Sequence, residues 1–243
     1  MTKRLGSLDT WRGLAIILMI LDHAVWIFAD IRISVTTIRF VTRFCLPLFC
    51  ILMGYFLAHQ VRFNLRRYTH LILAALVINV GYFSRYHQLE ILSSLLICAT
   101  LYWLLFYCGV QNWFALTALA PVFYWIDPTS VWHQRPPYDF ALFDYPLTVV
   151  MGFVAVGCIL KQVGTRTALS VTIFYLLGIW WIGGHTGLVF AWGPVVVLCI
   201  DWGKKNPSQE IRSISWIGKH PLSIYVIQYF VLWCIQWFVN RNT

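Results

Sequence analysis

Long runs of apolar residues, separated by short polar or proline-containing segments, fill most of the chain between residues 11 and 239. Most of them approach the roughly 20 apolar residues that a helix needs to cross the hydrocarbon core of a bilayer. They predict about nine membrane-spanning helices, with eight and ten as the neighbouring counts. The predicted spans are 11–29, 44–61, 69–84, 90–108, 112–126, 145–160, 168–183, 185–201 and 220–239. The predicted fold class is therefore all-α, a polytopic membrane helix bundle that forms a single domain over residues 1–243.

The polar segments between these runs differ in character. Residues 127–145 form the longest polar connection on the predicted outer side, and residues 202–219 form the longest loop on the inner side. Residues 30–43 carry three arginines among apolar residues, at spacings of seven and four. Because these spacings place the arginines on one side of a helix, we expect an interfacial helix that lies along the membrane surface.

The composition and charge support a membrane protein. Hydrophobic residues make up 60% of the 243 residues and charged residues only 11%, whereas a soluble domain carries about 25% charged residues. If the N-terminus is cytoplasmic, twelve of the 18 Lys and Arg residues fall on inner segments, as the positive-inside rule requires. The same rule accounts for the net charge of +9, so the charge favours membrane lipid or an anionic substrate as partner and does not indicate nucleic acid.

Residue types that bind metals are scattered along the chain. The seven cysteines lie in or next to apolar runs without a C-x-x-C pair, so we expect free, buried thiols. The seven histidines show no metal-ligand spacing, and His185, after two glycines, is typical of a loop histidine. The sequence therefore predicts neither a metal site nor a disulfide framework.

An Asp22-His23 pair stands near the middle of the first predicted span. Ionisable residues at this depth are costly and usually face a bundle interior or a water-filled path. Eleven helical steps of about 100° bring His23 back to the face of Arg12, whereas Asp22 points about 100° away from His23. We therefore expect Asp22 to bind a partner on another helix. The pair either fixes helix packing through hydrogen bonds, or His23 is a general base that accepts a proton from an attacking hydroxyl or amine.

Charged residues at the predicted inner ends of the first two spans are further candidates. Asp9 and Arg12 have the i,i+3 spacing of a local ion pair at a helix N-terminus, but Arg12 is also suited to bind a phosphorylated substrate. Arg62, Arg66 and Arg67 follow the second span and act either as a topogenic cluster or as a phosphate clamp. In the clamp, the i,i+4 pair Arg62 and Arg66 would hold phosphates together.

Residues within and beside the second and last spans have mainly structural interpretations. Arg43 suits an interface position from which its side chain snorkels. Gly54 permits close helix approach, and Pro221 suits the first turn of the last span. Gln228 lies about two turns into that span, where we expect it to form one interhelical hydrogen bond.

These segments resemble those of the transmembrane acyltransferase superfamily, which includes the acyltransferase-3, heparan-glucosaminide acetyltransferase-like and TraX-like proteins. The resemblance begins with Arg4-Leu5-x-x-Leu8-Asp9-x-x-Arg12-Gly13-Leu14-Ala15, followed by His23 in the same run. The stretch around Gly54, the arginines after the second span and Ile217-Gly218-Lys219…Ser223-Ile224-Tyr225 agree in order. The segments most similar to TraX-like proteins are Leu18-Met19-x-Leu21-Asp22-His23 and Arg43-x-x-x-Pro47-Leu48-Phe49.

The resemblance implies an integral-membrane acyltransferase of the bacterial cytoplasmic membrane. A cytoplasmic acyl-CoA, with acetyl-CoA as the leading candidate, would give its acyl group to an acceptor reached from the outer side. The acceptor would be a surface glycan or a pilin-type N-terminal amine. Two positions depart from the family pattern, because Gln228 stands where relatives often have a histidine and Met53 where they have a small polar residue.

The resemblance also assigns roles to the candidate residues. It implies that His23 is the essential catalytic residue, which acts as a base or carries the acyl group, and that Arg43 orients Asp22 or the reacting carbonyl. The residues it implies for the acyl-CoA site are Asp9, Arg12, Arg62, Arg66 and Arg67. The alternative is a non-catalytic membrane accessory or transport protein, in which Asp22-His23 is a packing or proton-relay pair.

Overall fold

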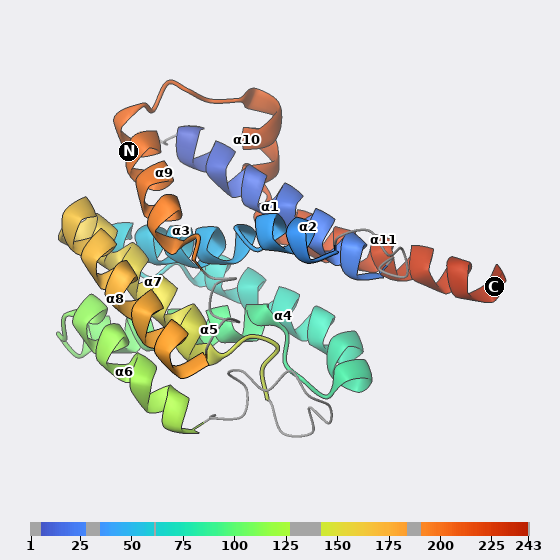
Figure 1. The fold of residues 1–243 in the computed structure, drawn as a ribbon, viewed down its shortest axis with the longest axis horizontal. Coiled ribbons are helices and arrows are strands. Elements are labelled where there is room, and N and C mark those ends of the chain that lie inside the picture. The colour runs from blue at the N-terminus through green and yellow to red at the C-terminus, as the bar shows by residue number, and fades with distance from the viewer. Residues whose placement is uncertain (1–5, 28–34, 61, 127–141, 184–190, 243) are drawn as a thin grey trace. The chain divides into compact units, whose positions relative to one another are not determined.

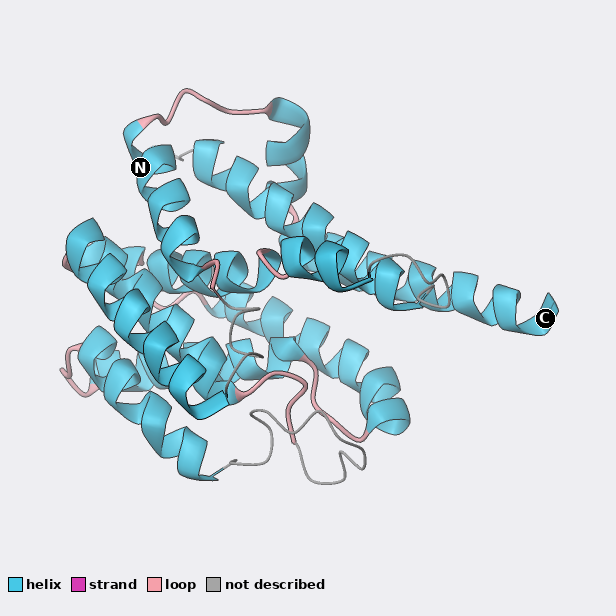
Figure 2. Cartoon of the chain, viewed as in Figure 1, coloured by secondary structure: helices cyan, strands magenta, loops and turns pink. Residues whose placement is uncertain are grey.

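The computed structural model describes residues 6–27, 35–60, 62–126, 142–183 and 191–242. These residues form α-helices with short connections and contain no strand (Figure 1, Figure 2). The helices are α1 (Gly6–Ile27), α2 (Val35–Thr42), α3 (Cys45–His59), α4 (Leu65–Tyr86), α5 (Ile91–Tyr107), α6 (Asn112–Ile126), α7 (Leu147–Gln162), α8 (Thr165–Gly183), α9 (Gly193–Lys205), α10 (Arg212–Lys219) and α11 (Pro221–Asn242). The all-α fold class is confirmed for the described residues.

Each predicted span overlaps a helix, and α6 begins and ends at the predicted residues. The span predicted over 185–201 meets α9 only from Gly193 onward, and 185–190 lie outside the described residues. α2 lies in the segment predicted as an interfacial helix, and Pro221 is the first residue of α11, as predicted. The prediction of a loop over 202–219 is wrong, because this segment contains the end of α9 and all of α10. α10 packs through small residues and not through an apolar run, because it buries Ser215 and Gly218 and leaves Trp216 exposed.

Two segments within the described residues are long and apolar enough to cross a membrane, by length and composition. They are Phe40–His59 and Pro221–Phe238. α5 and α7 are apolar but shorter. The predicted spans are therefore helical where they overlap these helices, whereas their number as membrane spans stays a prediction.

The cysteines are free, as predicted, but they are not all buried. Four are buried and Cys199 is half-buried, whereas Cys108 and Cys234 are exposed. Cys108 follows the last residue of α5 and Cys234 lies on α11, a helix with many exposed apolar side chains. Burial of these two thiols was therefore a wrong prediction, because an apolar run does not show which side of a helix meets the bundle.

The chain divides into two compact units, and α7 is the core of the second, Cys50–Val197. Every residue from Leu147 to Leu160 is buried, and α5, α6 and α8 pack against this helix (Figure 1). A methyl group at Gly54 of α3 would overlap the backbone carbonyl of Val154 in α7. The close helix approach predicted at Gly54 is thereby confirmed.

The first unit comprises Met1–Phe49 and Leu198–Thr243, and in it the C-terminal segment follows α1. Glu210 lies beside Gly6 at the start of α1, whereas Gln228 contacts His23 near its end. α11 runs along α1 in the same direction, whereas α10 crosses the start of α1, since Ile214 lies at Gly13 and the later Gly218 lies at Asp9 (Figure 1). α1 is thus the element that α2, α10 and α11 all contact.

Two glycines let the backbones of α1 and α10 touch. A methyl group at Gly13 would overlap the backbone carbonyl of Ile214, and one at Gly218 would overlap the carbonyl of Asp9. Contacts of this kind between small residues are typical of helices that associate within membranes. The position of α10 on α1 therefore depends on the absence of a side chain at both glycines.

We predict that Gly13→Ala destabilises the protein by about 1–3 kcal/mol, because the added methyl group forces α10 away from α1. Thermal unfolding of the detergent-solubilised protein measures the change. Gly178→Ala is the matched control, since a methyl group at that exposed position in α8 meets no atom within 4 Å. Equal unfolding temperatures for Gly13→Ala and the wild type would contradict the close contact.

Candidate functional site

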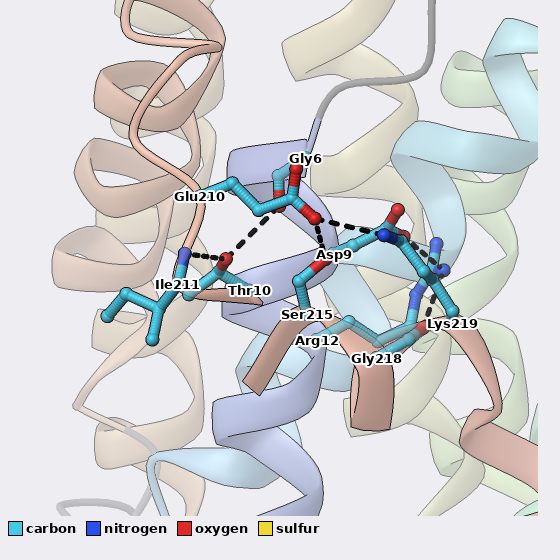
Figure 3. A network of polar contacts seen from close by, with 9 residues as sticks. All are labelled: Gly6, Asp9, Thr10, Arg12, Glu210, Ile211, Ser215, Gly218 and Lys219. Carbon is cyan, nitrogen blue, oxygen red and sulfur yellow. Dashed lines mark hydrogen bonds and ion pairs between the residues drawn. The ribbon is translucent and has the colours of Figure 1, made fainter. Parts of the chain in front are cut away.

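The N-terminal half of α1 is joined to α10 by a polar network (Figure 3). Arg12 Nη1 lies 3.1 Å from Asp9 Oδ1 and donates a hydrogen bond to the backbone carbonyl of Gly218 at 3.1 Å. The Asp9 side chain is buried and the Arg12 side chain is 19% exposed. The predicted local ion pair is confirmed, and it also ties α1 to the end of α10.

Glu210, in the connection before α10, holds this end of the network (Figure 3). One of its carboxylate oxygens, Oε1, accepts hydrogen bonds from Ser215 Oγ at 2.6 Å and from Lys219 Nζ at 2.9 Å. These two donors lower the pKa of the Glu210 carboxyl below its ordinary value. The backbone N–H of Ile211 donates to Thr10 Oγ1 at 3.2 Å, so the connection is fixed to α1 as well.

A cavity of about 460 Å³ adjoins this network. It lies between the first turns of α1 and the segment from α9 to α10, and its aromatic wall consists of Trp11 and Trp202. Ser208, Gln209 and Glu210 supply polar atoms at its edge. The cavity can therefore hold a ligand that has both apolar and hydrogen-bonding groups.

Asp22 is bound from the side of α2, not from the side of His23. Its Oδ1 accepts a hydrogen bond from Thr42 Oγ1 at 2.6 Å, and its Oδ2 lies 3.9 Å from Arg43 Nε. Asp22 is 5% exposed, so this carboxylate is compensated within the protein. The expectation that Asp22 binds a partner on another helix is confirmed, and Arg43 lies where it can orient Asp22.

His23 faces α11. Its Nδ1 lies 3.1 Å from Nε2 of Gln228, and its ring meets that of Tyr225 edge-on with the centroids 6.2 Å apart. Gln228 is 6% exposed, and its Oε1 is buried without a hydrogen-bond partner among the described residues. The interhelical hydrogen bond expected of Gln228 is confirmed. Its partner is His23, the residue predicted to be catalytic.

The faces of α1 are arranged as the helical angles predict. Arg12 and His23 both contact the C-terminal segment, at Gly218 and Gln228, whereas Asp22 turns toward Thr42. One face of α1 therefore carries a cation at its start and an imidazole further along. The neighbouring face holds the compensated carboxylate of Asp22.

Arg62, Arg66 and Arg67 are exposed and belong to the second unit. Asn64 caps α4, because its Oδ1 accepts a hydrogen bond from the backbone N–H of Arg67 at 3.1 Å. Arg62 therefore precedes the helix, and Arg66 lies in its first turn. Arg62 and Arg66 therefore do not share a helix, and whether they clamp phosphates together stays a prediction. The role of Arg62, Arg66 and Arg67 at a donor site stays a prediction. His185, predicted as a loop histidine, lies outside the described residues.

Several polar partners in this site were not predicted from the sequence, among them Thr42 and Glu210. Thr42 directly precedes Arg43, and Glu210 is the one acidic residue among several basic ones between 202 and 219. An acid in a basic segment was the available signal for Glu210. Thr42 gave no signal, because a lone threonine beside an arginine is common on helix ends.

The fold and the site together define an all-helical protein with helices of membrane length and a histidine held between its first and last helices. The family comparison agrees with this class. The family model described as heparan-alpha-glucosaminide N-acetyltransferase, catalytic, matches residues 4–230. The chain belongs to this family, and this membership indicates an acetyltransferase activity. Comparison with curated proteins and with solved structures gave no match.

We predict that Glu210→Gln removes a pH-dependent part of the stability of the first unit. Because the pKa of Glu210 is lowered by folding, its contribution is full above the ordinary glutamate pKa of about 4.3 and disappears as the pH falls through the lowered pKa. Thermal unfolding between pH 7 and pH 3 should show a lower unfolding temperature for Glu210→Gln at pH 7 and convergence with the wild type in acid. Gln209→Ala, an exposed neighbour, should follow the wild type; a constant difference at every pH would refute the charge-based explanation.

Proposed function

We propose that this protein is an integral-membrane acetyltransferase that moves an acetyl group from cytoplasmic acyl-CoA to an acceptor reached from the outer side. The observation that carries the proposal is the family match over residues 4–230, combined with the partly buried contact of His23 and Gln228. The match includes α1 and the part of α11 up to residue 230, which supply these two residues. The proposal keeps about nine membrane spans, one domain over residues 1–243 and a cytoplasmic N-terminus in the inner membrane of a bacterium.

In the proposed reaction, His23 is the general base. Its imidazole accepts the proton of the acceptor's amine or hydroxyl while the nitrogen or oxygen attacks the thioester carbonyl carbon. The carbon–sulfur bond then breaks, and the departing thiolate takes the proton from the imidazolium to give free CoA. The products are an amide or ester and CoA, so no proton is gained or lost. The alternative in which His23 carries the acetyl group uses the same ring in two steps.

The neighbours of His23 support a base that is neutral at rest. The carboxylate of Asp22 is engaged by Thr42 and Arg43, so the hydrogen-bond partner of the imidazole ring is the uncharged amide of Gln228. A carboxylate partner would favour the protonated ring, whereas an amide leaves it available to accept a proton. Asp22 is then a positioning residue that fixes α1 against α2.

The donor enters at the start of α1 in this proposal. Arg12 supplies positive charge there, with Asp9 orienting its guanidinium. The cavity beside Trp11 and Trp202 has aromatic walls and polar edges that suit parts of an acyl-CoA molecule. Arg62, Arg66 and Arg67 are proposed to add cationic groups for the phosphates.

The acceptor class is open between a surface glycan and a pilin-type N-terminal amine. The family name refers to an N-acetyltransferase that acts on a glucosaminide. This name favours an amino sugar as the first acceptor to test. A peptide with a free N-terminus is the second.

We predict that His23→Ala lowers acetyl transfer by at least about 100-fold, because general base catalysis supplies about 10²- to 10⁴-fold. The assay measures acetylation of an amino-sugar acceptor by proteoliposomes supplied with labelled acetyl-CoA. His70→Ala is the matched control, since His70 is an exposed histidine on α4.

The variant must remain in the membrane with an unchanged unfolding temperature. Near-normal transfer by folded His23→Ala would end the catalytic assignment. A wild-type protein that neither transfers acetyl groups nor binds acetyl-CoA would favour the accessory or transport role.

We predict that Arg62→Glu combined with Arg66→Glu weakens acetyl-CoA binding, because the substitutions place negative charge where phosphates would bind. The measurement is the rise in unfolding temperature on addition of acetyl-CoA, which should shrink in the variant. Arg166→Glu, a charge reversal at an exposed position in the first turn of α8, should respond like the wild type. An unchanged response of the double variant would remove these arginines from the donor site.

A further inference from the structure

The amide of Gln228 has one terminal atom beside His23 and one buried atom without a partner. Nε2 is the atom 3.1 Å from His23 Nδ1, and Oε1 is buried without a hydrogen bond within the described part of the chain. A buried polar atom without a partner costs free energy, so each such case requires an explanation. The two ends of an amide have nearly the same shape, and turning the group by 180° exchanges them.

Turning the amide does not remove the unpartnered atom. With Nε2 toward the ring, Gln228 donates to Nδ1 and the carbonyl oxygen is left over. With Oε1 toward the ring, Gln228 accepts a hydrogen from Nδ1 and the NH₂ group is left over. In both orientations one end of the amide meets His23, and the other end has no partner among the described residues.

The two orientations differ in what His23 can do. If Gln228 donates to Nδ1, the proton of the neutral ring lies on Nε2, which then cannot accept another. If Gln228 accepts from Nδ1–H, the lone pair lies on Nε2, which forms no hydrogen bond with a described residue and is able to act as a base. General base catalysis by Nε2 therefore requires the carbonyl oxygen of Gln228 to face His23.

We infer that Gln228 is a catalytic residue with two tasks, one for each end of its amide. Its Oε1 accepts the hydrogen of His23 Nδ1 and thereby keeps Nε2 basic. Its NH₂ group donates to the thioester carbonyl oxygen, on which negative charge develops as the acceptor attacks. This inference rests on the proposed function. It assigns the oxyanion donor to the same side chain that binds the base, His23.

The arrangement gives a physical reason for a glutamine at this position. Glutamine combines an acceptor and a donor at a fixed separation, whereas a carboxylate supplies acceptors only and an aliphatic side chain supplies neither. A neutral donor held in a water-poor site stabilises an oxyanion strongly, because it needs no reorganisation during the reaction. Tyr225, one turn earlier on α11, packs on the ring and limits its rotation.

Two substitutions of nearly equal size separate the tasks. Gln228→Glu keeps an acceptor for Nδ1–H but replaces the donor by a negative charge, so kcat should fall about 100-fold or more while KM changes little, measured at a pH where the His23 ring of the variant is neutral. Gln228→Met removes both groups and should lower kcat at least as much. Gln236→Glu and Gln236→Met, on the same helix, are the matched controls and should retain wild-type kcat.

The tautomer of His23 is measured separately by ¹⁵N nuclear magnetic resonance of histidine-labelled protein, assigned with His23→Gln. At a pH where the ring is neutral, Nδ1 should carry the proton in the wild type and in Gln228→Glu but not predominantly in Gln228→Met. A wild-type ring protonated on Nε2 would overturn the inference, and this spectrum decides even if Gln228→Met does not fold.

The failure of the inference and that of the proposed function have different signatures. Wild-type transfer that is lost in His23→Ala but kept in Gln228→Glu would support the function and overturn the oxyanion role of Gln228. A folded wild type that transfers no acetyl group would overturn the function and, with it, the assigned tasks of the amide.

Discussion

The backbone contact between α1 and α10 is the constraint on which the candidate site depends. Gly13 and Gly218 let the two helices touch, and Arg12 closes the contact by donating to the carbonyl of Gly218. α11 begins two residues after α10 ends. Its position along α1 is therefore set by this contact, and so is the pairing of Gln228 with His23. A packing feature at one end of α1 thus determines the chemistry further along the same helix.

The two carboxylates of α1 are compensated by different partners, one within the helix and one outside it. Arg12 compensates Asp9, and Thr42 and Arg43 engage Asp22. This distribution keeps the carboxylate of Asp22 away from the ring of His23, although the two residues are adjacent in the chain. Polar groups in an apolar helix are tolerated when they are paired. Here the pairing also leaves an uncharged amide as the partner of the proposed base.

Most of the fold and part of the site could be predicted from the sequence. Hydrophobic run length located the helices, and the angle of 100° per residue assigned Arg12 and His23 to one face of α1 and Asp22 to another. Helix α10 was not predicted, because its few apolar residues do not form a run long enough to indicate a membrane span. The partners Thr42 and Glu210 were missed because long-range hydrogen bonds leave no periodic pattern. The helix start at Leu65, which separates Arg62 from Arg66, depends on the Asn64 cap.

The central claim is that the protein adds acetyl groups to a molecule on the outer side of the membrane. The most direct measurement is mass spectrometry of surface glycans and pilin from otherwise identical cells with and without the gene for this chain. The account predicts that one acceptor class carries an added acetyl group only in cells that make the protein. Identical acetylation of both classes in the two strains would contradict it.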